Sequence, residues 1–276
     1  MLRVPNPRKI LLCLDTRFRN DFENTMSNDF TIDLPYELSN VVSIKFKSIE
    51  LVNGYYAIDE KSNNNKLKID DVEYPVPSGN YTISELKSLF EDILPSGINF
   101  EVDITNGKST FSSSSNFTLD FGINENEPNN TLGYSFGYRK QNYSDDKSYT
   151  SESIYNLEKD RYFYIFVDDF KSRNTYDNIV VVQKDKYLTK NILARIVNSG
   201  EAFQIIYEDN SDRIEKKRIH CVPVDINRLH IKVLNMYGNV ININNADYSL
   251  VLEFEVLSNN YWFMFWISFI RFNKIN

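Results

Sequence analysis

Few residues of this 276-residue chain have the chemistry of a catalytic centre. Its only histidines are His220 and His230, and its only cysteines are Cys13 and Cys221. His220 directly precedes Cys221, and because neighbouring residues on a strand point to opposite faces, these two side chains cannot form a catalytic pair. His230 lies out of phase with the apolar residues on either side of it, which is typical of an imidazole that faces solvent. None of these residues pairs a nucleophile with a base.

Two adjacent carboxylates, Asp168 and Asp169, follow an apolar strand and could bind a cation or share a proton. Carboxylates in that position more often accept backbone hydrogen bonds in a turn, which is the interpretation favoured for this pair. Basic residues Lys216, Lys217 and Arg218 are offset by acidic neighbours and are interpreted as a solvated loop. The sequence lacks the motifs of zinc, phosphate and dinucleotide sites and of a nucleophile elbow. We therefore expect no metal, no cofactor, no catalytic residue and no enzymatic activity.

The charge and the cysteine content exclude further classes. A formal net charge of −7 argues against nucleic-acid binding, because neutralising phosphates requires a concentrated basic surface. Two cysteines make neither a disulfide framework nor a metal site, and we expect semi-buried thiols in a protein that folds in a reducing compartment. No signal peptide is expected, because the apolar run near the N-terminus has only about five residues.

The elements that position these side chains are expected to be mainly β-strands. Phe and Tyr supply nearly all of a 14% aromatic share, and both suit pleated, half-buried strands. Phe30, Ile32 and Leu34 alternate with polar residues, the pattern of a strand with one buried face. Further strands are expected at 42–51, 162–167, 179–182, 192–196, 203–207, 228–234, 240–243 and 248–256. Because no helices separate them, they favour an antiparallel sandwich or jelly roll over a βαβ fold.

One expected strand changes face along its length. Within residues 42–51 the apolar positions shift by one after Phe46. A shift of one residue turns the following side chains to the other face, so we predict a bulge or twist near Lys47 and Ser48. A long strand of this kind is expected to bridge the two sheets of a sandwich.

A different pattern interrupts the strands. Residues 83–93 carry apolar side chains at helical spacing after Thr82 or Ser84, either of which can cap a helix, and short strands follow. We therefore predict a mainly β fold, an antiparallel jelly-roll β-sandwich with an inserted small α+β module. The predicted parts are an N-terminal arm at 1–29, the sandwich at 30–70 and 154–257, the inserted module with its linker at 71–153, and a hydrophobic C-terminal tail at 258–276.

Both ends of the chain carry candidate subunit contacts. In the arm, residues 10–14 could pair as a strand, and the charged stretch after them is expected to order against a neighbouring subunit. The candidate contact residues of the arm are Asp15, Arg17, Phe18 and Arg19. Deleting residues 1–29 is expected to spare the fold of the monomer and to abolish assembly.

The tail contains the most hydrophobic stretch, residues 261–270, with both tryptophans. This stretch is too short to span a bilayer as a helix, which requires about 20 residues. Three interpretations stay open: a buried final strand, a subunit contact, or a shallow insertion into a membrane. The candidate contact residues of the tail are Trp262, Phe263, Phe265 and Trp266.

Several segments, in this order and spacing, are similar to one family. They are residues 14–19 (LDTRFR), 30–35 (FTIDLP), 42–51 (VSIKFKSIEL), 79–82 (GNYT), 132–139 (LGYSFGYR), 192–196 (ILARI), 223–229 (PVDINRL) and 247–253 (DYSLVLE). Together they resemble the single jelly-roll minor capsid and penton (vertex) proteins of large eukaryotic nucleocytoplasmic DNA viruses, the giant viruses. The segment at 132–139 resembles the family's Leu-Gly-x-x-x-Gly-Phe-Arg element. The resemblance spans nearly the whole chain to about Val256, and the tail departs from it.

The resemblance implies a structural virion protein, a subunit of an icosahedral capsid. Five copies would close a vertex as a homo-pentamer, or copies would line the shell beneath the major capsid protein. The implied partners are the major capsid protein, minor capsid proteins and, for the tail, an internal viral membrane, with no nucleic acid among them. The implied location is the virion, after synthesis in the host cytoplasm.

Two other classes compete with a capsid role. A carbohydrate- or receptor-binding jelly-roll module could use the Tyr-rich segment 134–149, because aromatic faces stack on sugars. An enzyme built on a double-stranded β-helix would need a triad of histidines and a carboxylate around a metal, which His220 and His230 are badly placed to supply. The binding module stays open as the alternative.

Overall fold

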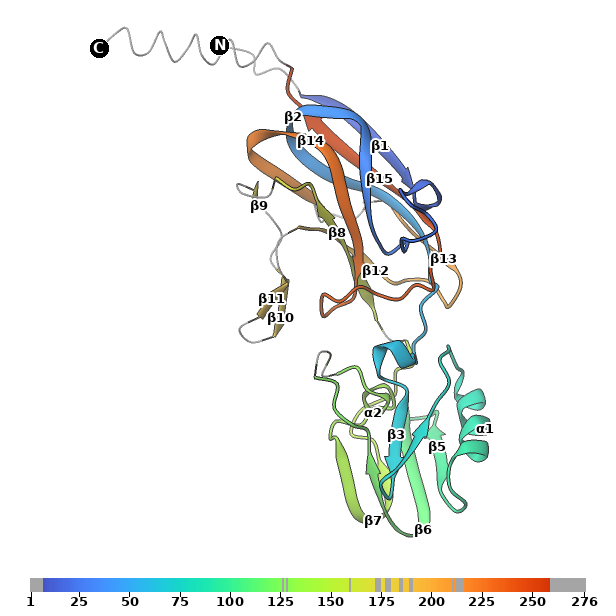
Figure 1. Cartoon of the computed structure of the whole chain (residues 1–276). Coiled ribbons are helices and arrows are strands. Elements are labelled where there is room, and N and C mark those ends of the chain that lie inside the picture. Colours follow the sequence, from blue (N-terminus) through green and yellow to red (C-terminus); the bar gives the residue numbers. More distant parts are fainter. Residues whose placement is uncertain are drawn as a thin grey trace, which may run out of the picture. The chain divides into compact units, whose positions relative to one another are not determined.

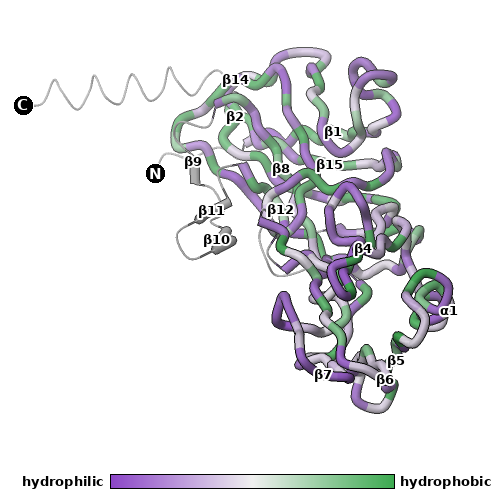
Figure 2. The backbone as a smooth tube through the Cα atoms, turned by 60° about the horizontal axis from the view of Figure 1, so that its bottom comes forward, coloured by the Kyte–Doolittle hydropathy of each residue, from purple (hydrophilic) through white to green (hydrophobic). Residues whose placement is uncertain are grey.

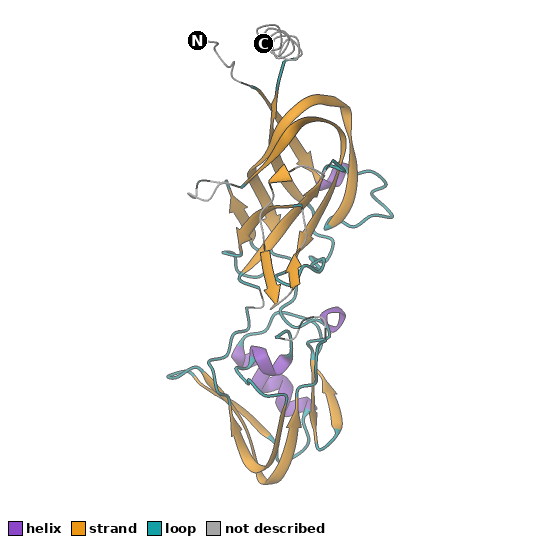
Figure 3. Cartoon of the chain, turned by 90° about the vertical axis from the view of Figure 1, so that its left-hand side faces the viewer, coloured by secondary structure: helices purple, strands orange, loops and turns teal. Residues whose placement is uncertain are grey.

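The chain divides into two compact units (Figure 1). Unit 1 comprises Met1–Gly54 and Tyr162–Asn276, and unit 2 comprises Tyr55–Arg161. The structure, a computed structural model, describes residues 7–258 except 126, 128, 159, 172–174, 177–179, 184–185, 189–190, 210 and 212–215. Strands account for 51% of the described residues and helices for 9%, and all strand pairs among these residues are antiparallel, which confirms the expected mainly β class (Figure 3).

Unit 1 is built around two long strands, β2 (Asp29–Val52) and β14 (Lys217–Leu234). Near its start β2 pairs with the end of β14, as in the pair Phe30 and Ile231. Farther along, β2 pairs on one side with β15 (Tyr248–Val256) and on the other with the start of β14. Each long strand therefore belongs to two layers and passes from one to the other.

These pairings define the two layers of the sandwich. The first layer contains β1 (Arg8–Asp15), β15, the second half of β2, and β13 (Ile205–Glu208) with the start of β14. The second layer contains the first half of β2, the end of β14, β8 (Tyr162–Asp168) and β12 (Ile192–Val197). This is the strand order of a jelly roll, in which two Greek keys form a double sheet, as the sequence predicted. The smaller strands are β9 (Thr175–Tyr176), which pairs with β14, and β10 (Val180–Gln183) and β11 (Lys186–Leu188), which pair with each other.

The predicted change of face in β2 is a bulge. Val251 of β15 lies opposite Ser48, whereas the next residue, Leu252, lies opposite Phe46, so Lys47 is the extra residue. The bulge lets Phe46 and Ile49 both be buried although an odd number of positions separates them. The prediction of a bulge near Lys47 and Ser48 is confirmed.

Apolar side chains at alternate strand positions form the interior of the sandwich, as the alternation of hydropathy along the backbone indicates (Figure 2). Burial of this surface is the main favourable term for the fold. The fully buried members with 0% exposure are Val41, Ile44, Phe46, Ile49, Ile165, Val167, Leu193, Ile196, Ile226, Leu229, Ile231, Val233, Leu250, Leu252 and Phe254.

The expected N-terminal arm does not stand apart from the sandwich. Residues 8–15 form β1, which pairs without irregularity from Arg8 opposite Val256 to Asp15 opposite Ser249. Leu14 is buried, so this strand contributes to the core. The boundary at residue 29 is therefore wrong, and deleting residues 1–29 would remove an edge strand of the first layer. The expectation that such a deletion spares the fold is corrected accordingly.

Unit 2 is a small α+β module, wider than predicted. Its strands and helices are β3 (Lys66–Ile69), β4 (Val72–Pro75), α1 (Ile83–Ile93), β5 (Asn99–Asp103), β6 (Lys108–Asp120), α2 (Leu132–Ser135) and β7 (Asn142–Thr150). The sheet order is β4-β3-β6-β5, and β7 also pairs with β6. Unit 2 begins at Tyr55 rather than at 71, because Ile58 and Leu67 pack in the same core as Phe90 of α1.

The helix α1 begins and ends where its sequence pattern predicts. The Thr82 hydroxyl accepts a hydrogen bond from the Glu85 backbone N–H, and the Glu85 carboxylate accepts one from the Thr82 N–H at 2.8 Å. This capping box satisfies two backbone donors at the start of the helix. The same backbone bond from Thr82 lowers the pKa of Glu85. On the inner face, the Phe90 ring contacts Phe100 edge-on, with ring centroids 4.9 Å apart.

Residues 132–139, the most distinctive of the resembling segments, lie in the core of unit 2. Leu132 and Phe136 are fully buried, and Tyr138 is 2% exposed. A Cβ atom at Gly133 would lie 2.3 Å from the Phe121 ring. At Gly137, φ is +92°, and a Cβ atom would lie 2.2 Å from the backbone oxygen of Ser153. Packing and backbone conformation thus account for both glycines of the segment.

Gly137→Ala should destabilise unit 2 by about 3 kcal/mol, because a positive φ and a backbone clash both oppose the added methyl group. The matched control is Gly97→Ala, where φ is +95° and a Cβ atom would meet nothing within 4 Å. This control should cost only the backbone strain, about 1 kcal/mol. Urea unfolding followed by circular dichroism measures both, and equal losses would contradict the packing role of Gly137.

Candidate subunit-contact site

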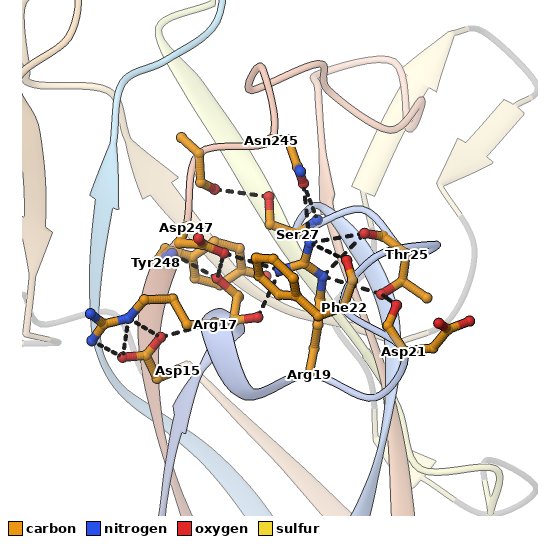
Figure 4. A network of polar contacts seen from close by, with 12 residues as sticks. Asp15, Arg17, Arg19, Asp21, Phe22, Thr25, Ser27, Asn245, Asp247 and Tyr248 are labelled. Atoms are coloured by element: carbon orange, nitrogen blue, oxygen red, sulfur yellow. Dashed lines mark hydrogen bonds and ion pairs between the residues drawn. The ribbon is translucent and has the colours of Figure 1, made fainter.

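The first candidate contacts lie on the short helix η1 (Thr16–Phe18), directly after β1. The Asp15 carboxylate caps this helix by accepting from the Arg17 backbone N–H at 3.0 Å and from Arg17 Nε at 2.9 Å (Figure 4). The side-chain bond to Arg17 lowers the pKa of Asp15, and the same bond raises the pKa of Arg17. Phe18 is 78% exposed and the Arg17 side chain 66%. These residues are accessible to a neighbouring molecule, as a contact requires.

Arg19 behaves differently, because its side chain has 0% exposure. Its guanidinium donates to the Thr16 carbonyl at 2.8 Å, to the Thr25 carbonyl at 2.9 Å and to the Asp247 carboxylate at 3.1 Å. It also stacks on the Phe22 ring at 4.1 Å from the centroid. Arg19 therefore holds the loop 16–28 in place and offers a neighbour no side-chain surface. The expectation that Arg19 is itself a contact residue is corrected to an anchoring role.

A second loop completes this network. Thr16 donates its hydroxyl to Asp247 at 2.8 Å and accepts from the Tyr248 backbone N–H at 2.9 Å. Asn245 accepts from the Ser27 backbone N–H at 3.0 Å (Figure 4). The loop 16–28 is thus bonded to the segment that enters β15, more than 200 residues later in the chain. The sequence reasoning missed Asn245 and Asp247 as partners, although Asp247 begins one of the resembling segments.

The anchored loop presents apolar side chains to solvent. Phe18, Phe22 and Met26 are exposed to 78%, 47% and 44% respectively. A loop held by internal hydrogen bonds loses little conformational entropy when a partner binds it. The loop 16–28 is therefore a pre-ordered surface rather than a segment that must fold on contact.

The other candidate contacts, Trp262, Phe263, Phe265 and Trp266, lie outside the described residues. The three interpretations of the tail stay as they were. Among the helices that are described, none has the length and apolar character needed to cross a membrane.

The carboxylates at the end of β8 form the predicted turn. Asp168 accepts from the Phe170 N–H at 2.8 Å, and Asp169 accepts from the Lys171 N–H at 2.9 Å. Asp169 has a second role that the sequence did not indicate. Its other carboxylate oxygen lies 3.3 Å from Arg218 Nη1 and 3.3 Å from His220 Nε2, and all three side chains are at most 1% exposed.

The basic residues near 217 are not a solvated loop. Arg218 is 1% exposed and lies on β14, opposite the buried Ile44 of β2. Lys216 is 3% exposed, and its ammonium donates to Glu208 of β13 at 2.7 Å. Burial of such charges is tolerated because each has a carboxylate partner. The local excess of charge in the sequence could not reveal that the start of β14 and the residue before it are buried.

The remaining reactive side chains are spread over the sandwich. Cys13 and Cys221 are both exposed free thiols, so the expectation of semi-buried thiols is wrong. His230 is partly buried and lies 2.6 Å from Asp29. Within the described part of the chain, no three His, Cys, Asp or Glu side chains gather as a metal site would require.

Comparisons with known proteins add a likeness to solved structures. No protein-family model matches the sequence, and no curated protein does. The crystal structure of selenomethionine-labelled mavirus penton protein is similar to this chain with a TM-score of 0.47 and 10% identity, covering 91% of this chain and 100% of the other. A likeness at that identity and score assigns neither a family nor a role. The jelly-roll assignment stands on the strand pairing alone.

Arg19→Met should destabilise unit 1 by about 2–4 kcal/mol, because the Asp247 carboxylate and the carbonyls of Thr16 and Thr25 all lose a buried charged donor. The control, Arg17→Met, removes an exposed ion pair and should leave the free energy of unfolding unchanged within error. Urea unfolding compares the two. A loss from Arg17→Met as large as that from Arg19→Met would contradict the anchoring role.

Asp169→Asn should cost about 3 kcal/mol or more, because the buried Arg218 guanidinium then faces a neutral amide in place of a carboxylate. Asp168→Asn is the matched control, since an amide oxygen can still accept the bond from the Phe170 N–H. Chemical unfolding at neutral pH measures both variants. Equal stability of the two would show that the Asp169 carboxylate contributes nothing specific.

Proposed function

We propose that this chain is a structural virion protein, a subunit of an icosahedral capsid that serves as the penton at the fivefold vertex or as a minor capsid protein. One observation carries the proposal. Most of the segments that resemble this family fall, in chain order, on strands of the jelly roll and on the core of unit 2, and 79–82 directly precedes α1. They coincide with the end of β1 and η1, with both halves of β2, with 132–139, and with β12, β14 and β15.

The architecture suits a building block. Jelly rolls are a common fold of viral capsid proteins, and a sandwich of this kind is rigid enough to keep its loops in fixed positions. The loop 16–28 is one such loop, because Arg19 and Asp247 anchor it and Phe18 projects from it. A shell needs subunits whose contact surfaces are ordered before they meet, because ordering them on contact weakens the association.

The alternative of a carbohydrate- or receptor-binding module loses its main support. Of the tyrosines in 134–149, Tyr138 and Tyr149 are buried in the core of unit 2. Tyr143 is partly buried, which raises its pKa to about 12, and its hydroxyl donates to Glu152 at 2.7 Å. Tyr134 is 41% exposed, but the Arg139 guanidinium lies over its ring at 4.3 Å. Each of these rings is therefore buried or in contact with another group of the same chain. The structural role is the better supported of the two.

In this proposal the partners are further copies of the chain, in a homo-pentamer, together with the major capsid protein and minor capsid proteins. Contact with an internal viral membrane is assigned to the tail. The protein is made in the host cytoplasm, resides in the virion, has no nucleic-acid partner and performs no catalytic step.

The test is the composition of particles of the virus that encodes the chain. The protein should stay with purified particles through a high-salt wash, and a particle reconstruction should contain its two units at the fivefold vertices or beneath the shell. Absence from washed particles would overturn the proposal. A glycan array probed with the purified chain adds an independent readout, because specific binding would favour the alternative module.

A further inference from the structure

The first layer of unit 1 has two margins at which a strand pairs on one side only. Among the described residues, β1 pairs with β15 alone and β13 pairs with β2 alone. Because β15 occupies one side of β2 and β13 the other, the layer runs β1-β15-β2-β13. The strands β1 and β13 are therefore its opposite margins. Unpaired margins of this kind are templates for pairing with another chain.

The margin at β13 is apolar on its outer face. Ile206 points inward and is 1% exposed, whereas Ile205 and Tyr207 on either side of it are 67% and 58% exposed. Edge strands of soluble proteins usually carry charges or proline that prevent pairing with another chain. The outer face of β13 carries neither a charge nor a proline at these two positions, so nothing there opposes pairing with another chain.

The margin at β1 has a matching outer face. Leu14 points inward, and Leu11 is 59% exposed with Cys13 also exposed. The two margins show the same face of the layer to solvent. Asp15 lies opposite Ser249, Ser249 opposite Glu50, and Glu50 opposite Tyr207, which places all four side chains on one side.

The strand directions at the two margins are compatible with pairing. The strand β1 is antiparallel to β15, β15 is antiparallel to β2, and β2 is antiparallel to β13. It follows that β1 and β13 run in opposite directions. A second copy placed beside the first, with its layer in the same orientation, would bring its β13 antiparallel to β1.

We propose that β1 of one copy pairs antiparallel with β13 of the next copy, so that the first layers of neighbouring subunits join into a continuous sheet. The favoured register sets Leu11 opposite Tyr207 and Cys13 opposite Ile205, which brings these four exposed side chains into cross-strand contact. The inference rests on the proposed capsid role and names the surface by which copies associate.

Charge supports the same register. It brings Lys9, whose side chain is 60% exposed and which pairs with Glu253 of its own chain at 3.2 Å, beside the exposed Asp209 that follows β13. Arg8 adds a second basic residue at the start of β1. A register shifted by one residue would turn Leu11 and Cys13 away from their partners. The contact joins two different surfaces, and such head-to-tail contacts form a ring when the rotation closes.

A disulfide trap tests the register. In a Cys221→Ser background that keeps Cys13, Ile205→Cys places two thiols on directly opposed residues, whose Cβ atoms lie about 4.5–5.5 Å apart across an antiparallel pair. Diamide, which removes the two thiol hydrogens as the sulfur–sulfur bond forms, should yield dimers and higher oligomers on a non-reducing gel. The controls are Val197→Cys in the same background, which places a thiol at a 51% exposed position of β12, and Cys13→Ser added to Ile205→Cys.

Cross-linking through Ile205→Cys that depends on Cys13 and exceeds the Val197→Cys control supports the pairing. Monomers only, or the same yield from the Val197→Cys control, would overturn it.

A mixing experiment tests the head-to-tail geometry without cysteines. Leu11→Glu blocks the β1 margin, and Tyr207→Glu blocks the β13 margin, both at exposed positions that should not affect folding. Each variant alone should stay monomeric by native mass spectrometry. Mixed at equal amounts, they should form a one-to-one dimer, because each retains the margin that the other lacks.

A mixture that stays monomeric, or homodimers of either variant alone, would contradict the proposal. Thermal unfolding confirms that both variants are folded.

These outcomes separate the inference from the proposed function. A chain that is found in particles but neither cross-links nor forms the mixed dimer keeps its capsid role and loses this interface. A chain that pairs through β1 and β13 but is absent from particles keeps the interface and loses the capsid role.

Discussion

The pairing of β2 with β14 is the constraint on which unit 1 depends. These strands pair near both ends of their length, with Phe30 opposite Ile231 in one layer and Ile44 opposite Arg218 in the other. Because both strands pass between the layers together, the sandwich is held by continuous backbone as well as by its core. The other strands add to this pair: β15 and β1 on one side of β2, and β8 and β12 beyond β14.

The charges inside unit 1 follow from that crossing. The start of β14 carries Arg218 and His220 into the protein, and Asp169 at the end of β8 meets both. A second buried pair lies after β1, where Arg19 is buried beneath the loop 16–28 and pairs with Asp247. In each case a buried arginine is matched by a carboxylate distant in sequence, since an unmatched buried charge is too costly to retain. Buried polar chemistry in this chain therefore serves the architecture.

In unit 2, aromatic side chains serve the architecture in the same way. Its tyrosines and phenylalanines converge on Phe90 and Phe136, and the glycines of 132–139 let backbone and rings approach closely. The aromatic side chains of this segment, which in an exposed loop could bind a sugar, fill a small core instead. The accessible apolar residues include two ordered surfaces, on the loop 16–28 and along the margins of the first layer. Such surfaces suit association better than catalysis.

The sequence by itself determined the features that depend on local pattern. Period-two alternation predicted most strands of the sandwich, although the expected strand at 240–243 is only an isolated bridge at Val240. The shift after Phe46 predicted the bulge at Lys47, and the Thr82–Glu85 cap predicted where α1 begins. It also placed Asp168 and Asp169 in a turn. Tertiary structure alone decided which distant groups meet: that residues 8–15 pair with β15, that Arg19 reaches Asp247, and that Arg218 is buried against Asp169. The physical reason is that alternation and capping act between near neighbours in the chain. Burial and pairing depend instead on strands whose paired residues lie as far apart as Arg8 and Val256, and no local pattern encodes the order of those strands.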